Sequence, residues 1–257
     1  SQIMKNGSLE TKSYRLIEPV VLLSGIVIAS PHSGRNYLSS VKEQSILDPI
    51  TLRSSEDAFV DELMDFAPAL GIPLICSEIP RAFVDLNRGR DELDPAIIEG
   101  IKPNRQNPRV ISGLGVIPRV VANGKEIYSG KLSKEAAIER LENFWDPYHS
   151  KLAELLDRAR QQFGYSILID THSMPHEAIL NASSSFRTSQ IVLGDRYGAT
   201  CAPEIINDKN WGYITGKLLP PHSLIEDYGS FKKIFLSKNF YLMIDINENK
   251  LSEISRV

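Results

Sequence analysis

Two short apolar runs, far apart in the chain, each lead to a histidine followed by a serine, and this repetition strongly constrains the fold. Residues 25–30 lead to His32, and residues 165–169 lead to His172. Each run is rich in β-branched residues and has the length of one buried strand. In an open α/β sheet, ligands bind outside the carboxyl ends of the strands. We therefore expect His32 and His172 to meet over one site.

Segments typical of strands and of helices alternate along the chain, which indicates an α/β fold with a mostly parallel sheet. The expected strands cover residues 25–30, 72–76, 83–87, 165–169, 191–195 and 240–246. One helix is expected to open at Ser54 and end at Gly71, and a longer one to run from the N-cap Ser133 to Gly164. Pro147 should kink the longer helix. Because no linker or internal repeat is evident, we expect a single domain over residues 1–257.

Composition and charge exclude several classes of function. Of the 257 residues, 42% are hydrophobic and 24% are charged, which is ordinary for a globular protein. The net charge of -3 gives no reason to expect a nucleic-acid or anionic-membrane partner. No apolar stretch is long enough to cross a bilayer, and the start of the chain lacks the order of a signal peptide. Cys76 and Cys201 have no metal-type spacing, so a reduced, cytoplasmic protein of open oligomeric state is expected.

Two histidines and one carboxylate form a common catalytic zinc site, in which bound water has a pKa of about 7. A single histidine at a strand end is more often a hydrogen-bonded structural residue, so the matched pair is what favours a metal. For the carboxylate, Glu56 and Asp57 both follow the His32 loop closely enough to turn back towards it. Ser54 and Asp57 also have capping-box spacing, which would instead place Asp57 in a helical first turn. The residues alone leave this choice open.

Arginine residues indicate a substrate that carries a carboxylate. Asn87 and Arg88 place an amide beside a guanidinium at the end of an expected strand, and a guanidinium binds a carboxylate through two parallel hydrogen bonds. The alternative for Arg88 is a surface ion pair with a nearby acid, and Arg81 is a weaker candidate of the same kind. Residues 89–123 include Arg119 and are rich in Gly, Pro, Asn and Arg. A loop of that length is uncommon unless it is functional, for example as a lid.

A series of short motifs then follows in order across roughly the first 200 residues. The motifs are residues 30–34, 56–61, 81–88, 117–120, 127–128, 146–149, 169–175 and 193–196. In this combination the chain resembles the N-formylglutamate amidohydrolase family, which is similar in fold to zinc carboxypeptidases and aspartoacylases. The resemblance implies an α/β, three-layer αβα sandwich with a mixed, mostly parallel sheet (phosphorylase/hydrolase-like) and with metal at the strand ends.

The resemblance also implies roles for individual residues. His32, Asp57 and His172 would hold zinc, because Asp57 rather than Glu56 falls at the family's acid position. Asn87 and Arg88 would match the Asn-Arg pair with which zinc carboxypeptidases and aspartoacylases hold a substrate carboxylate, and Arg81 and Arg119 are further candidates for substrate binding. The implied reaction is the hydrolysis of N-formyl-L-glutamate, or of a similar small-molecule N-acyl acidic amino acid, to formate and L-glutamate, at the end of histidine degradation.

The C-terminal portion departs from the family pattern. The family usually has a Gly-Gly-Tyr loop, of which residues 211–215 keep only part, and then a strand containing Gln-Ile-Glu-Ile before an arginine. Residues 242–247 stand in that place, so the acidic residue expected to be the family's general base would here be Asp245, one methylene shorter. A misplacement near 1 Å can cost on the order of 100-fold in rate. The alternatives are therefore a related zinc hydrolase of another N-acyl amino acid or small peptide, and a non-catalytic binding protein.

Overall fold

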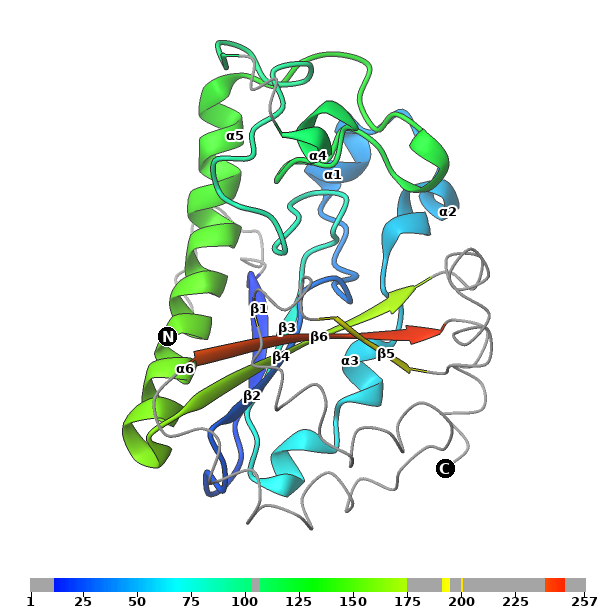
Figure 1. The fold of residues 1–257 in the computed structure, drawn as a ribbon. Helices are drawn as coiled ribbons and strands as arrows, with labels where there is room; N and C mark the ends of the chain where they lie inside the picture. The colour runs from blue at the N-terminus through cyan, green and yellow to red at the C-terminus, as the bar shows by residue number, and fades with distance from the viewer. Residues whose placement is uncertain (1–11, 103–106, 175–190, 195–199, 201–238, 248–257) are drawn as a thin grey trace. The chain divides into compact units, whose positions relative to one another are not determined.

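The computed structural model describes residues 12–102, 107–174, 191–194, 200 and 239–247 (Figure 1). The chain divides into two compact units. The first consists of Ser1–Arg15, Pro31–Ala58 and Cys76–Leu152, and the second of Leu16–Ser30, Phe59–Ile75 and Ala153–Val257. The expectation of one domain over residues 1–257 stays a prediction.

The described strands form one mixed sheet in the order β1-β3-β2-β4-β6-β5. Their bounds are β1 (Tyr14–Ile17), β2 (Ile26–Ser30), β3 (Leu74–Ser77), β4 (Ser166–Met174), β5 (Ile191–Gly194) and β6 (Asn239–Asn247). β4 pairs in parallel with β2 on one side and with β6 on the other, whereas β5 pairs antiparallel with β6. The α/β class and the mixed, mostly parallel sheet expected from the sequence are therefore confirmed, and β1 is an addition to the expected strands.

β2 and β4 form the apolar centre of the second unit. Their register pairs Ile26 with Ile167 and Ala29 with Asp170, and the aliphatic side chains between these pairs are buried. Beyond the last paired residues, the Thr171 hydroxyl donates to the Ala29 carbonyl at 2.7 Å, so a side chain continues the link between the two strands. β4 then runs on through His172, which lies inside the strand and not, as expected, after its end.

The expected helix from Ser54 to Gly71 is wrong in its first half. The chain forms α1 (Ser39–Gln44), α2 (Pro49–Leu52), the 3-10 turn η1 (Arg53–Ser55), α3 (Val60–Leu63) and the 3-10 turn η2 (Ala67–Leu70). Glu56 has extended backbone angles and Phe59 a left-handed φ of 65°, so Asp57 precedes α3, whose N-cap residue is Phe59. The reason is tertiary, because the Asp57 N–H donates to the His32 carbonyl at 3.0 Å. Gly71, with a φ of 75°, ends η2 as expected.

The long helix is present but contains a π-helical turn. It consists of α5 (Lys134–Arg140), the π turn η4 (Leu141–Trp145) and α6 (Asp146–Phe163). The Ser133 hydroxyl accepts from the Ala136 N–H at 3.1 Å, and Gly164 follows the last turn with a φ of 78°. Pro147 lacks an N–H and its ring would clash with the carbonyl four residues before it. The interruption expected at Pro147 therefore takes the form of a wider turn directly before it.

The expected strand over residues 83–87 is wrong, because this segment of the first unit forms successive turns. Phe83, Val84 and Leu86 are all buried, so the segment lacks the one-sided burial that strand alternation predicts. The following loop contains α4 (Pro108–Ile111) and the 3-10 turn η3 (Ala122–Gly124).

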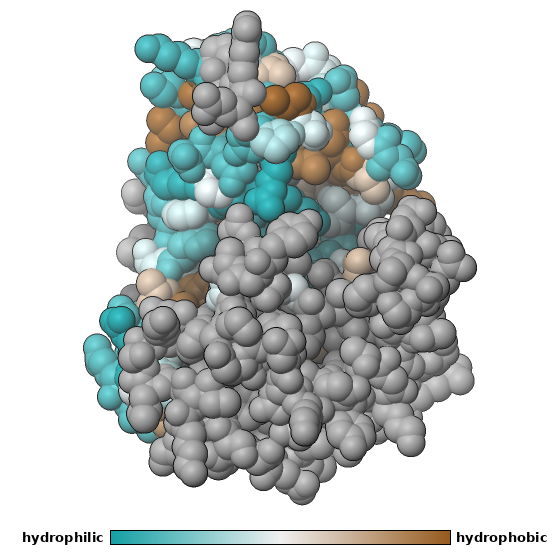
Figure 2. Space-filling model, in the orientation of Figure 1, coloured by the Kyte–Doolittle hydropathy of each residue, from teal (hydrophilic) through white to brown (hydrophobic). Residues whose placement is uncertain are grey.

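The face of the molecule in Figure 2 shows mainly hydrophilic side chains with smaller hydrophobic patches where residues are described. None of the described helices combines the length and the hydropathy needed to span a bilayer.

Candidate active site

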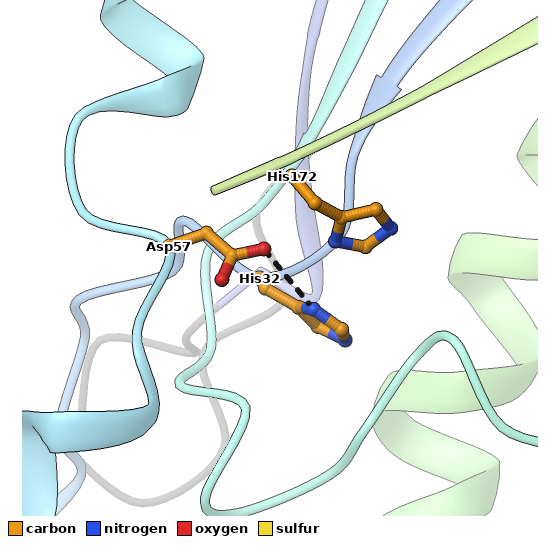
Figure 3. A group of neighbouring side chains, drawn as sticks. All are labelled: His32, Asp57 and His172. Carbon is orange, nitrogen blue, oxygen red and sulfur yellow. Dashed lines mark ion pairs between the residues drawn. The ribbon is translucent and has the colours of Figure 1, made fainter. Parts of the chain in front are cut away.

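His32, Asp57 and His172 form a buried group with the donor chemistry of a metal site (Figure 3). One ligand atom from each of the three residues lies within 4.8 Å of the other two. His32 Nδ1 lies 3.3 Å from Asp57 Oδ2. Two imidazoles and one carboxylate are a common protein ligand set for catalytic zinc. The residues present therefore fit a zinc ion, and the group could hold a metal.

The loop after β2 fixes the place of His32. Residues 31–34 leave the strand and run against Ile79, where a Cβ added at Gly34 would overlap the Ile79 carbonyl. Only glycine allows this approach of two backbones. The Asp57 N–H bond to the His32 carbonyl ties the next ligand to the same loop. A hydrogen bond thus joins the backbones of His32 and Asp57, in addition to the approach of their side chains.

Asp85 connects the candidate metal ligand His32 with the arginines, and the sequence analysis missed it. Its carboxylate is 1% exposed; Oδ1 lies 2.7 Å from His32 Nε2, and Oδ2 lies 3.0 Å from Arg81 Nε and 3.8 Å from Arg88 Nε. Burial raises the pKa of Asp85, but His32 and the two arginines outweigh it and hold the pKa well below its usual value. With Nε2–H donating to this carboxylate, His32 presents Nδ1 on the side of Asp57. The sequence feature that could have pointed to Asp85 is its place at the start of the run Asp-Leu-Asn-Arg, residues 85–88.

His172 has a carboxylate partner of its own. Asp170 lies two residues earlier on β4, and its Oδ2 is 3.0 Å from His172 Nε2. Residues two apart on a strand face the same side, which is why this local pairing forms. Both residues are buried. Each histidine of the group is therefore oriented by a carboxylate, an arrangement that fixes the tautomer and ring direction of metal-binding histidines.

Glu56, the alternative third ligand, is engaged elsewhere. Its Oε1 accepts a hydrogen bond of 2.6 Å from the Tyr37 hydroxyl and one of 3.1 Å from Arg53 Nε. Burial and the neighbouring Glu56 raise the pKa of Tyr37 well above its usual value, so the hydroxyl keeps its proton and donates. Asp57, with its side chain in the metal group, is the acid that the geometry favours.

Arg81 and Arg88 approach the same carboxylate from two turns of the chain. Arg88 Nε donates to the Leu114 carbonyl at 3.0 Å and its Nη1 to the Asn87 carbonyl at 2.7 Å, and its nearest described acid is Asp85. Burial lowers the pKa of Arg88, and Arg81 and Arg109 lower it further while Asp85 opposes them. A cation held near other cations is a favourable place for an anionic ligand.

The remaining predicted site residues have other surroundings. Arg119 pairs with Asp94 at 3.0 Å and with Glu126 at 3.8 Å, and it donates to the Ile111 carbonyl at 3.1 Å. Asp245 is the register partner of His172 on β6, so the backbones of these two residues lie side by side. The side chains of β6 and the residue 211–215 motif lie outside the described part of the structure.

Comparison with known proteins agrees on one family. A family model described as N-formylglutamate amidohydrolase matches residues 24–209. N-formylglutamate deformylase of Pseudomonas putida is 30% identical over 184 residues, which are 69% of this chain and 61% of that protein. The deformylase of Pseudomonas aeruginosa is 28% identical over 186 residues, 70% of this chain and 62% of that protein. The chain thus spans about three fifths of the length of these curated relatives.

Solved structures extend the similarity over more of the chain. The crystal structure of N-formylglutamate amidohydrolase from Ralstonia eutropha JMP134 matches with a TM-score of 0.75 at 30% identity and covers 92% of this chain and 86% of that one. A protein of Agrobacterium tumefaciens matches with a TM-score of 0.61 at 12% identity and shows the fold alone.

Proposed function

The chain belongs to the N-formylglutamate amidohydrolase family, and from this premise we propose that it hydrolyses N-formyl-L-glutamate, or a similar N-acyl acidic amino acid, to formate and L-glutamate. A small-molecule substrate, a place in histidine degradation and a cytoplasmic location belong to the same proposal. The names of the two curated deformylases and of the Ralstonia amidohydrolase support the choice of substrate.

The observation that carries the proposal is the position of Asp85. One buried carboxylate holds a candidate metal ligand through Oδ1 and two arginines through Oδ2. An N-acyl amino acid has a scissile amide a few bonds from a carboxylate, so its enzyme needs an electrophilic centre beside a cation. The Asp85 contacts place the candidate metal ligand His32 beside the cations Arg81 and Arg88, within one unit of the chain.

We propose His32, Asp57 and His172 as the residues that hold zinc. When bound, zinc would polarise an amide carbonyl and lower the pKa of a coordinated water to about 7. The protein's own contribution is to orient the two imidazoles, with Asp85 and Asp170 each accepting an N–H. Burial of the group limits competing water and strengthens its electrostatic interactions.

Substrate binding and proton transfer fall to other residues. Arg88, with Asn87 beside it, would bind the substrate carboxylate, and Arg81 would add positive charge. Arg119 is retained as a candidate from the sequence, although it pairs with Asp94 and Glu126 and donates to the Ile111 carbonyl. Asp245 would accept a proton from the attacking water and deliver it to the leaving amine. Its register position beside His172 supports this role.

Metal analysis and a deformylase assay of the purified chain test the proposal, with His172→Ala as the control. Zinc in the protein and formate release that the control loses are the expected results. A panel of N-acyl amino acids identifies a related hydrolase if another substrate is preferred. Binding of N-formyl-L-glutamate without turnover, unchanged in Asp245→Glu, would instead show a binding protein. Absence of both zinc and hydrolysis would refute the proposal.

A further inference from the structure

The backbone around Asn87 is held by side chains rather than by secondary structure. Three successive carbonyls accept hydrogen bonds, that of Leu86 from His149 Nε2 at 2.9 Å, that of Asn87 from Arg88 Nη1 at 2.7 Å, and that of Arg88 from Trp145 Nε1 at 2.9 Å. The segment forms turns and has no strand partner. Its conformation therefore depends on these donors.

The two donors from the long helix form one rigid unit. Trp145 and His149 are four residues apart, and their rings stack with centroids 3.9 Å apart and planes 30° apart. Tyr148 packs its ring edge against His149 and against Tyr14 of β1. Stacked aromatic rings have little rotational freedom, so both N–H groups point in fixed directions.

The π turn η4 allows two residues of the long helix, Arg140 and Trp145, to reach the segment around Asn87. In a regular α-helix, residues five apart point about 140° away from each other, because each residue turns by about 100°. In η4 the Asp146 N–H bonds to the Leu141 carbonyl, so the turn is wider and residues five apart come closer to one face of the helix. Arg140, whose guanidinium lies 4.1 Å from the centre of the Phe83 ring, and Trp145 therefore contact the same segment.

We propose that Trp145 and His149 are positioning residues for the substrate carboxylate. They hold the carbonyls on either side of Asn87 and so aim the Asn87 amide and the Arg88 guanidinium, whose Nε and Nη1 already brace it against the backbone. The remaining N–H groups of the guanidinium fork are those that a carboxylate would use. This inference rests on the proposed function of Arg88 and adds the device that orients it.

Trp145→Phe tests the inference, because phenylalanine keeps the stack on His149 but removes the N–H donor. The KM for N-formyl-L-glutamate should rise about fivefold, as expected for one lost hydrogen bond, with kcat and zinc content within twofold of wild type. His149→Phe should act alike, and His149→Gln, which restores an N–H donor, should recover part of the loss. Arg90→Gln is the matched control, because it removes the exposed Arg90–Asp146 ion pair at the same helix start and should leave KM unchanged.

A double-mutant cycle separates positioning from general destabilisation. In an Arg88→Lys background, which lacks the fork, Trp145→Phe should raise KM by a smaller factor than in the wild type. Additive effects, or equal effects of Trp145→Phe and Arg90→Gln, would overturn the inference. Amide hydrogen exchange gives a readout without substrate, and exchange over residues 83–90 should be faster in Trp145→Phe than in Arg90→Gln. If the wild type neither binds nor hydrolyses the substrate, the proposed function fails, and unchanged exchange over residues 83–90 would separately refute the positioning.

Discussion

At the scale of single residues, each candidate metal ligand is held in place by a contact with another residue. His32 donates to Asp85 and His172 to Asp170, and the backbone of Asp57 is tied to that of His32. The histidines could be predicted, because a strand that leads to a histidine is a local pattern. The contact between Asp85 and His32 could not, because it joins residues 53 apart in the chain.

Asp85→Asn should lower zinc affinity about 10- to 100-fold, the usual effect of losing the carboxylate that supports a metal-binding histidine. An asparagine keeps the shape but removes the charge that stabilises the His32 N–H and the two arginines. Competition with a chromogenic chelator measures the affinity. Asp94→Asn is the matched control, since Asp94 is equally buried and pairs with an arginine, Arg119, without contacting a candidate ligand. Equal zinc affinities of the two variants would contradict this role of Asp85.

Asp57 and Glu56 should differ clearly when each is neutralised. Asp57→Asn should lower zinc affinity by more than about 100-fold, because a lost ligand costs more than a lost supporting contact. Glu56→Gln should leave the affinity unchanged, because Glu56 accepts from Tyr37 and Arg53. Zinc titration of both variants by calorimetry makes the comparison. The reverse order would assign the third ligand to Glu56.

At the scale of elements, the sequence predicted those whose conformation is decided locally. β2, β4 and β6 each contain a continuous apolar run, and the long helix has a regular apolar stripe between a serine cap and a glycine stop. The predictions failed where backbone hydrogen bonds between residues far apart in the sequence determine the conformation. Asp57 leaves the expected helix to bond the His32 carbonyl, and the Asp85 N–H donates to the Val116 carbonyl at 2.8 Å instead of to a neighbouring strand.

Thr171→Val tests how β2 and β4 are joined next to His172. The substitution keeps the branched shape but leaves the buried Ala29 carbonyl without its donor at 2.7 Å. The free energy of unfolding should fall by about 1–3 kcal/mol. Urea denaturation at equal zinc saturation measures it. An unchanged midpoint would show that another group satisfies the carbonyl.

At the scale of the whole molecule, the ligand group draws on three widely separated parts of the chain, near residues 32, 57 and 172. The three ligands come together only in the folded chain, so the ion binds the folded chain and not the unfolded one. Zinc should therefore raise the free energy of unfolding by about 2.7 kcal/mol at a free concentration 100 times its Kd. Denaturation with and without a chelator measures this gain. His172→Ala should lose most of it, and a gain that survives in this variant would place the ion elsewhere.

Gly34 shows how a residue without a functional group can be as indispensable as a ligand. Any side chain there would displace the Ile79 backbone, which leads directly into the turns that carry Arg81 and Asp85. In a saturation library selected for growth on the substrate, position 34 should tolerate substitution as poorly as position 32. Relatives that keep this activity should then keep both the glycine at position 34 and the histidine at position 32.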